Sequence, residues 1–308
     1  MMVLEGKKVL VTGLTGKIGA AIAAHFAPKC EMWGLARYSR KGAWEEAEGL
    51  GVRPIKGDMA GPLDHVPDDF DYVLNIAALI SPRTTDEGIV HNCEAPVRLM
   101  SQCRKAKAFL HVSTVSVHAY STDPRHVYTE ESDLGAGIGS AYGVSKLAGE
   151  GAVRAAAVML DIPTVICRQN IQYGGTHPEM NVFEHVITQF LETGEVPVPT
   201  TGNYYSSADY IDDIPFWVEP CLGVASVPAT VVNWCADHPL DWREVFDYVG
   251  RLVGKEPRFV QVEKFPFPHS IQDPAKRIVI AGHERTPWKQ GFRQTLQSRF
   301  PHLTLNDV

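Results

Sequence analysis

The stretch TGLTGKIG at residues 12–19 is the feature that most constrains the fold. It directly follows the apolar run KKVLV and directly precedes the helix-like run AAIAAHF. In a strand–turn–helix setting the first glycine supplies a tight turn, the second lets the backbone approach a pyrophosphate, and the third lets the helix pack closely on the sheet. The free N–H groups at the helix start would bind the phosphates. We therefore predict a nucleotide-binding turn, rather than a plain connection, made of Gly13, Thr15, Gly16, Lys17, Ile18 and Gly19.

Apolar runs alternate with helix-like stretches through the first half of the chain. The expected strands are 7–13, 31–37, 71–78, 107–117 and 162–168, and the expected helices are 17–26, 87–106 and 140–160. Strands that alternate with helices indicate βαβ units, and right-handed crossovers then give a doubly wound parallel sheet. We predict an α/β fold of the Rossmann type.

The pattern changes after about residue 170, where the sequence becomes turn-rich and proline stays frequent as far as Pro287. Helix-like pieces remain at 181–194 and 241–254, with isolated strands at 229–236 and 257–263. We expect a dinucleotide-binding domain over 1–170, completed by excursions from the second half. Residues 171–308 should form mainly a smaller, mixed substrate-binding lobe.

Composition excludes several classes of protein. The formal net charge of -7 argues against a nucleic-acid-binding surface, which normally carries a basic excess. Apolar runs are too short to span a membrane, and the N-terminus lacks the cleavage site of a signal peptide. The six cysteines are scattered, and the twelve histidines form no metal-ligand pattern with a nearby carboxylate. We expect a soluble cytoplasmic protein with no metal site.

The end of the second strand predicts which dinucleotide is bound. An acidic residue there would bind the ribose 2′-OH of NAD, whereas arginine accommodates the 2′-phosphate of NADP. In EMWGLARYSRK the acid Glu31 comes too early, and Arg37, Arg40 and Lys41 follow the strand. These cations suit a phosphate. We therefore expect NADP(H), with NAD(H) as the alternative and a solvated basic loop as the competing interpretation.

The glycine turn and YGVSK at 142–146 together resemble the short-chain dehydrogenase/reductase superfamily. The length and further motifs resemble its extended branch, the NAD(P)-dependent epimerase/dehydratase family, over most of the chain. YIDDI at 210–214 and DPAKRIVIAGHERTPW at 273–288 are similar to the V-D-D-V segment and the C-terminal motif of that family.

The resemblance implies further cofactor contacts. GDM at 57–59 is similar to a turn whose aspartate contacts the adenine, which points to Asp58 with Met59 beside it. LNIAA at 74–78 is similar to the segment that lines the cofactor, which points to Ala77 and Ala78. Asn92 matches a helix asparagine of the family.

Tyr142 and Lys146 lie four residues apart in a helix-like stretch, so they share a helix face. A lysine ammonium nearby would move the tyrosine pKa down from about 10 toward neutrality. The resemblance places Thr114 at the Ser/Thr position of the family. It implies that Thr114 binds the substrate oxygen, Tyr142 exchanges its proton, and Lys146 holds the nicotinamide ribose.

The substrate side departs from the family pattern. Val115 and Ser116 stand where the 4,6-dehydratases carry Asp-Glu, so dehydration is not expected. Ile171 replaces an asparagine, with Asn170 one place early and expected to face elsewhere. Ser206 stands at the position of a diphosphate-binding arginine, which leaves Arg277 as one candidate cation. We expect substrate contacts from Ser116, Asn170 and Arg277, with Ser113 pointing away.

We therefore predict an NADP(H)-dependent oxidoreductase that transfers a hydride at a ketone, aldehyde or secondary alcohol, with Tyr142 as acid and base. The substrate would be a small carbonyl, alcohol or sugar-like molecule that need not carry a nucleotide. A nucleotide-sugar epimerase or 4-reductase is the first alternative, and a non-catalytic NADP(H)-sensing protein is the second. The resemblance also implies a homodimer, with which the small residues of LAGEGAVRAAAVML are compatible.

Overall fold

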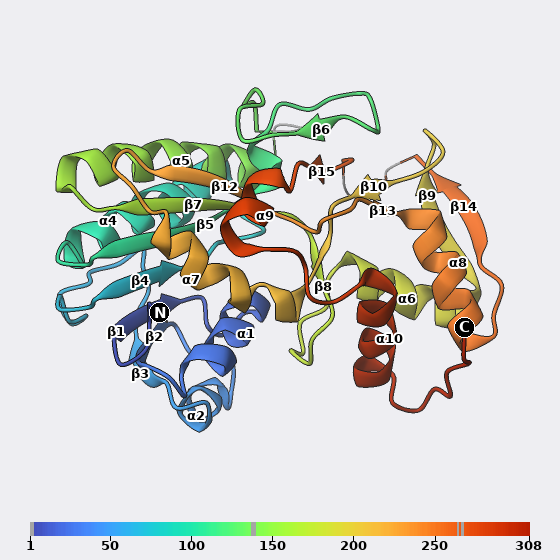
Figure 1. Cartoon of the computed structure of the whole chain (residues 1–308), viewed down its shortest axis with the longest axis horizontal. Helices are drawn as coiled ribbons and strands as arrows, with labels where there is room; N and C mark the ends of the chain where they lie inside the picture. Colours follow the sequence, from blue (N-terminus) through green and yellow to red (C-terminus); the bar gives the residue numbers. More distant parts are fainter. Residues whose placement is uncertain (1–2, 137–139, 264, 266–267) are drawn as a thin grey trace.

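The computed structural model describes residues 3–136, 140–263, 265 and 268–308. A sheet domain and a second lobe lie side by side (Figure 1). The described residues include no helix long and apolar enough to cross a membrane.

In this described part of the chain, a central sheet of seven parallel strands has the order β12-β7-β5-β4-β1-β2-β3. Its strands are β1 (Lys8–Thr12), β2 (Glu31–Ala36), β3 (Arg53–Lys56), β4 (Tyr72–Asn75), β5 (Ala108–Thr114), β7 (Thr164–Gln169) and β12 (Thr230–Trp234). Most of their residues are buried, as expected for parallel strands covered on both faces. The predicted doubly wound α/β fold is confirmed.

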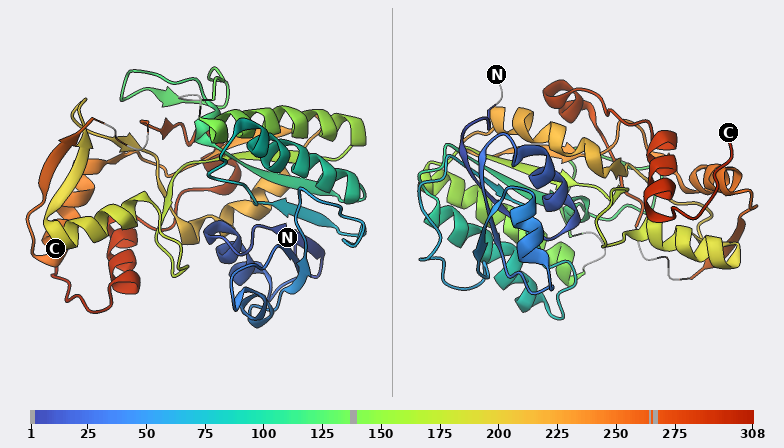
Figure 2. Two further views of the ribbon diagram at one scale, coloured as in Figure 1. Left: turned by 180° about the vertical axis from the view of Figure 1, so that it is seen from behind. Right: turned by 90° about the horizontal axis from the view of Figure 1, so that it is seen from below.

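Helices cover both faces of the sheet. The elements around it are α1 (Lys17–Phe26), α2 (Ala43–Gly49), α3 (Thr85–Ile89), the π-helical turn η1 (Val90–Glu94), α4 (Ala95–Gln102), the 3-10 turn η2 (Val115–Val117), α5 (Ala141–Leu160), the 3-10 turn η3 (Ile211–Asp213), α7 (Pro215–Gly223) and α9 (Ala275–Ala281). One hydrophobic core lies between the sheet and helices α1, α2 and α7, and a second lies between the sheet and helices α4 and α5. Figure 2 shows α4 and α5 on the face opposite α1 and α7.

The second lobe has its own aromatic core. Its elements are β6 (Val127–Tyr128), β8 (Gln172–Tyr173), α6 (Val182–Thr193), β9 (Glu195–Pro199), β10 (Tyr205–Ser206), β11 (Asp209–Tyr210), β13 (Leu240–Asp241), α8 (Trp242–Val253), β14 (Arg258–Val262), β15 (Ile271–Gln272) and α10 (Trp288–Arg299). Tyr173 stacks on Phe292 at 4.2 Å between ring centroids, and Trp242 packs on Phe246. Helix α6 begins with a capping box, in which Asn181 and Glu184 bind each other's backbone N–H groups.

The chain returns to the sheet domain after entering the second lobe. The segment expected to hold an isolated strand at 229–236 instead forms β12, which pairs in parallel with β7 as an edge of the central sheet. Helix α7 packs under the sheet, and α9 packs beside α7 (Figure 1).

The carboxyl ends of the strands meet at one edge, where parallel sheets hold their ligands. Thr12 of β1 is in register with Asn75 of β4, which is in register with His111 of β5. Thr114 at the end of β5 is in register with Gln169 of β7. This edge faces the second lobe (Figure 1).

Candidate active site

The glycine turn is built by close backbone approach. Gly13 has φ of +69°, and a Cβ atom there would lie 2.7 Å from the backbone nitrogen of Ala77. A Cβ atom on Gly19 would lie 2.3 Å from the carbonyl oxygen of Gly13. Side chains at these two positions would therefore force the turn apart from the end of β4 and from the helix it starts.

The start of α1 fits a phosphate group. Gly16 is its N-cap residue, and no side chain caps the helix, which leaves N–H groups at its first turn for an anion. A Cβ atom on Gly16 would have its nearest neighbours at 3.4 and 4.0 Å, so this backbone is open to approach. Thr15 and Ile18 are half-buried, and Ile18 packs against the core.

The side chain of Lys17, a residue of the predicted nucleotide-binding turn, points to the second lobe. Its Nζ atom donates to both carboxylate oxygens of Glu184 on α6, at 2.7 and 2.8 Å. Both side chains are almost completely buried. Burial lowers the pKa of Lys17, and Glu184 counters that effect. Lys17 therefore joins the turn to the second lobe with its charge already paired.

The segment after β2 carries three cations, of which one is paired with a carboxylate. Arg37 is exposed and makes no ion pair with another described residue. Arg40 forms a two-pronged contact with Glu46 at the start of α2, with Nη1 2.7 Å from Oε1. Because Glu46 neutralises Arg40, the basic patch predicted for a 2′-phosphate is reduced to Arg37 and its neighbour Lys41.

The segments predicted to line the adenosine side follow β3 and β4. Asp58 is exposed and accepts a bond from the backbone N–H of Ala60, whereas Met59 packs into the hydrophobic core. Ala77 is half-buried and Ala78 is exposed. Small side chains after β4 leave this edge open in front of the glycine turn.

Asn92 ties the β4 loop to α5. Its side chain accepts from the N–H of Leu79 at 2.7 Å, and it donates to the Leu79 carbonyl and to Ser145 on α5. It lies in the π-helical turn η1 and is 1% exposed. π-Helical turns are frequent at functional sites. Here the turn places Asn92 where it fixes both the loop and the helix.

Thr114, Tyr142 and Lys146 meet at the carboxyl edge of the sheet. Thr114 ends β5, and Ser140 caps α5 by accepting a hydrogen bond from the N–H of Gly143. Tyr142 therefore lies in the first turn of α5. Lys146, one turn later, donates from Nζ to the carbonyl oxygen of Val112 at 2.8 Å.

The pKa values of the two helix residues shift in opposite directions. Burial raises the pKa of Tyr142, and a hydrogen-bonding interaction with the Thr114 hydroxyl works against that rise. Burial lowers the pKa of Lys146 to about 8, while the carboxylate of Glu150 opposes the change. In the ligand-free protein, burial and Thr114 account for the shift of Tyr142, rather than the lysine charge expected from the sequence.

The predicted substrate contacts divide into an open and a closed group. Ser116 is half-buried in η2, and its N–H donates to the Thr114 hydroxyl at 3.2 Å. Ser113 is buried. Asn170 is 4% exposed, and its side-chain Nδ2 donates to the carbonyl oxygen of Ser270 and to the side-chain oxygen of Gln272. These hydrogen bonds tie the end of β7 to the segment around β15, and they argue against the predicted substrate contact of Asn170.

Arg277 is completely buried. Its guanidinium donates to the Cys235 carbonyl at 3.0 Å, forms an ion pair with Asp237, and lies over the ring of Trp217. This arrangement argues against the predicted contact with a substrate diphosphate. Ser206, at the arginine position of the family, is also buried.

Sequence reasoning missed a polar chain across the three central strands. The Thr12 hydroxyl donates to the side-chain oxygen Oδ1 of Asn75 at 2.8 Å, and the side-chain Nδ2 of Asn75 donates to Nδ1 of His111 at 2.9 Å. Nε2 of His111 therefore carries the proton. Thr12 also accepts from the N–H groups of Ile76 and Ala77, which fixes the loop beside the glycine turn. Asn75 within an apolar run was the available signal.

A buried ion pair stands behind Lys146. Arg168 of β7 donates to both carboxylate oxygens of Glu150 on α5, at 3.0 to 3.3 Å, and both side chains are almost fully buried. Glu150 comes one helical turn after Lys146, and that i,i+4 spacing was readable from the sequence. The pair holds α5 on the sheet.

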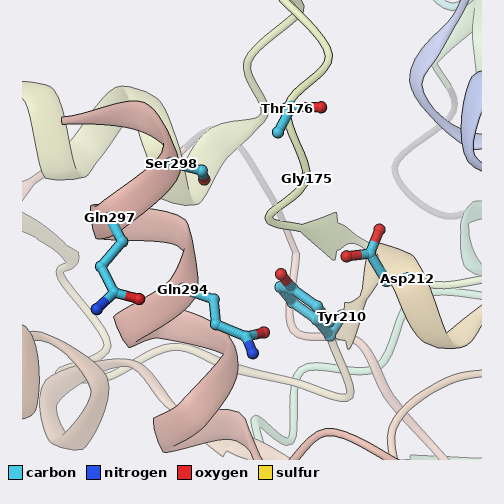
Figure 3. Close-up of a pocket in the computed structure, with 7 residues that line it drawn as sticks. All are labelled: Gly175, Thr176, Tyr210, Asp212, Gln294, Gln297 and Ser298. Atoms are coloured by element: carbon cyan, nitrogen blue, oxygen red, sulfur yellow. The ribbon is translucent and has the colours of Figure 1, made fainter. Parts of the chain in front are cut away.

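A shallow hollow of about 380 Å³ lies on the second lobe. It is lined by Gly175, Thr176, Tyr210, Asp212, Gln294, Gln297 and Ser298. Figure 3 shows Gln294 extending from α10 toward Tyr210. The described lining residues do not include Thr114, Tyr142 or Lys146, so this hollow is distinct from the catalytic edge. Among the described residues, no group of His, Cys, Asp and Glu side chains could hold a metal ion.

Comparison with known proteins identifies the family. The sequence model of the NAD dependent epimerase/dehydratase family matches residues 9–214, well over half of the chain. The chain belongs to this family. That membership confirms the resemblance to extended short-chain dehydrogenases and makes the chain an NAD(P)-dependent enzyme of that chemical type.

An uncharacterised UDP-glucose epimerase of Bacillus subtilis is 27% identical over 186 residues, or 58% of this chain. The match spans 56% of the length of that relative.

Solved structures of the family share the fold. A UDP-glucuronic acid 4-epimerase of Bacillus cereus, in complex with UDP-glucuronic acid and NAD, has a TM-score of 0.82 at 21% identity, covering 94% of this chain and 98% of that one. A UDP-N-acetylglucosamine 4-epimerase of Methanobrevibacter ruminantium, in complex with UDP-N-acetylmuramic acid, has a TM-score of 0.81 at 19% identity, covering 97% and 100%. At this identity the likeness shows the fold.

Proposed function

We propose that this enzyme epimerises a nucleotide sugar by oxidising one secondary alcohol to a ketone and reducing it again. The observation that carries the proposal is the meeting of Thr114, Tyr142 and Lys146 at the sheet edge that also holds the glycine turn. The nucleotide sugars of the similar proteins, UDP-glucuronic acid among them, favour the sugar class.

The residues divide the chemistry among them. The Thr114 hydroxyl would hold the substrate oxygen. Tyr142 would take the hydroxyl proton as a hydride leaves the same carbon, and would return a proton when the ketone is reduced. Lys146, charged below a pKa of about 8, would bind the ribose and favour the tyrosine anion. A nicotinamide dinucleotide held by the glycine turn would supply the acceptor and donor of the hydride.

NADP(H) is the proposed cofactor, although several structures with this fold contain NAD. The support is Arg37, exposed at the end of β2 without an ion-pair partner among the described residues. The pairing of Arg40 with Glu46 weakens this support, since it removes one of the two expected arginines.

A second candidate function is net reduction or oxidation of a substrate without a nucleotide. The observation that favours it is the shortage of cations for a diphosphate, because Arg277 is committed to Asp237 and Ser206 replaces an arginine. The two functions differ in their use of cofactor. An epimerase returns the hydride to its own substrate, whereas a net reductase consumes one dinucleotide per turnover.

To test this, the purified protein is incubated with UDP-glucose, UDP-glucuronic acid or UDP-N-acetylglucosamine, together with NAD or NADP. Proton NMR would follow inversion at a sugar carbon, and melting temperature would report binding of UDP. Epimer formation without net change in cofactor supports the proposal. Dinucleotide turnover with simple ketones, together with no melting shift from UDP, would favour the second function.

A homodimer is also proposed, through α5. Val158 and Met159 on this helix are 56% and 84% exposed, which is unusual for apolar side chains so close together. Small residues nearby would allow a second helix to approach. Sedimentation of the wild-type protein should give the mass of a dimer, and Met159→Glu should shift it toward the monomer.

A further inference from the structure

The starts of two helices face each other across a buried ion pair. Lys17 is the first residue of α1, directly after the glycine turn, and Glu184 is the third residue of α6. The Lys17 side chain is 4% exposed and the Glu184 side chain 0%, with Nζ within 2.8 Å of both carboxylate oxygens. Because the proposed phosphate site is the start of α1, the ion pair lies next to that site.

Glu184 serves more than one group. Its carboxylate also accepts from the N–H of Gly174 at 3.0 Å and from the N–H of Asn181 at 2.7 Å. Arg299 of α10 lies 3.9 Å away. These neighbours would hold the carboxylate in place if the lysine were lost. Glu184 is thus a fixed negative charge that Lys17 balances.

A second carboxylate approaches the same turn. Oε2 of Glu179 lies 4.0 Å from the position of a Cβ atom on Gly16, and His177 donates from Nε2 to the carbonyl oxygen of Thr15 at 3.1 Å. The segment between β8 and α6 therefore lies against the turn that would receive phosphates. Negative charge on this segment opposes an anion at the turn.

We propose that Lys17 and Glu184 form a positioning pair that sets the charge beside the dinucleotide phosphates, with Lys17 balancing a carboxylate that would otherwise repel them. This inference rests on the dinucleotide binding of the proposed function, and it does not depend on which substrate is used. Lys17 then affects cofactor affinity through Glu184 and not by contacting a phosphate.

We expect two single variants to change dinucleotide affinity in opposite directions. Lys17→Met removes the cation in direct contact with Glu184 and leaves only Arg299, 3.9 Å away, to offset the carboxylate near the turn, so dinucleotide binding weakens. Glu184→Gln keeps the capping acceptor and leaves the ammonium of Lys17 unbalanced, so dinucleotide binding becomes tighter. A pair that only holds the two lobes together would weaken binding in both variants. The sign of the Glu184→Gln effect therefore separates the charge role from a purely structural one.

Titration calorimetry with NADP and with NAD measures the effect without catalysis. We expect Lys17→Met to raise the Kd about tenfold, on the scale of one charge acting across several ångströms near a surface. The matched control is Lys105→Met, which removes a lysine from an exposed ion pair with Asp68 and should leave the Kd unchanged. Circular dichroism checks that each variant is folded.

The double variant Lys17→Met/Glu184→Gln keeps the test decisive if Glu184→Gln alone does not fold, because it removes both charges of the pair and leaves neither of them buried without the other. We expect its Kd to return to within about twofold of wild type, since the two charge changes cancel. Opposite shifts in the single variants, or this recovery in the double variant, support the proposal.

Shifts in the same direction, no shift at all, or a double variant as weak as Lys17→Met would overturn the proposal. Failure of the wild-type protein to bind either dinucleotide would instead overturn the proposed function, on which this inference rests.

Discussion

Lys146 on α5 reaches the strand that carries Thr114, because its Nζ atom donates to the carbonyl oxygen of Val112 at 2.8 Å. The side chain is buried, and Glu150 follows it by one helical turn. The lysine is therefore held at the end of β5 by the protein alone. Its position beside the proposed site is set before any ligand binds.

Burial of Lys146 makes stability depend on pH. The folded-state pKa of Lys146 is about 8, below its ordinary value of 10.5. Below pH 8 the lysine is protonated in both states and the cost of burying its charge is fully present. Between pH 8 and 10.5 the folded protein releases its proton first, so that cost is lifted as pH rises. Wild type should therefore gain up to about 3 kcal/mol of unfolding free energy relative to Lys146→Met across this window.

Urea unfolding of both proteins at several pH values measures this difference. The exposed variant Lys105→Met serves as the control and should show no such window. A stability difference between wild type and Lys146→Met that stays constant from pH 7 to 10.5 would contradict the burial argument.

Tyr142→Phe removes the proton carrier and leaves the glycine turn intact. Turnover should fall by about 10²–10⁴, the usual contribution of a positioned acid or base. Dinucleotide affinity should stay close to wild type if Tyr142 acts mainly on the substrate. Steady-state rates and calorimetry separate the two effects. Turnover equal to wild type would contradict the role of Tyr142 as the proton carrier.

Arg37→Ala tests the choice of dinucleotide. The exposed guanidinium should interact with a 2′-phosphate and not with a ribose diol. We expect the Kd for NADP to rise about tenfold, on the scale of a charge-assisted contact, while the Kd for NAD changes little. Arg40→Ala should have the smaller effect, since Glu46 already pairs with Arg40. Equal loss of both dinucleotides, or wild-type preference for NAD, would remove the case for NADP.

Arg277→Met tests whether this arginine is structural. Its buried guanidinium pairs with Asp237, so removal leaves a largely buried carboxylate with only His283 and the N–H of Glu284 as partners. Unfolding free energy should fall by about 3–5 kcal/mol. The KM for a nucleotide sugar should change little in the folded enzyme. A large rise in KM with unchanged stability would restore the diphosphate contact expected from the sequence.

Local sequence patterns predicted the sheet domain well. The run KIGAAIAAHF forms α1 over the expected residues, and the segment around Tyr142 forms α5. These segments carry strong local signals: glycine spacing, apolar periodicity and a serine cap. The edge strand β12 was placed outside the sheet, because its partner β7 lies more than sixty residues earlier and pairing at that separation leaves no local mark.

The candidate site was only partly readable from the sequence. The positions of Thr114, Tyr142 and Lys146 follow from motifs within single elements. The roles of Lys17, Asn170 and Arg277 depend on partners such as Glu184, Gln272 and Asp237, which come from distant parts of the chain. A polar side chain in a binding motif therefore predicts a ligand contact only when that side chain is not already bound to a buried residue of the protein.

Isotope tracing on the nucleotide-sugar panel tests the central claim most directly. Each sugar would carry deuterium at the carbon expected to invert, and proton NMR would follow the reaction in the presence of NADP or NAD. We expect an epimer to form with the deuterium retained at that carbon, and Tyr142→Phe to slow its formation by about 10²–10⁴. The contrary result would be no epimer from any sugar, with UDP failing to bind the folded protein.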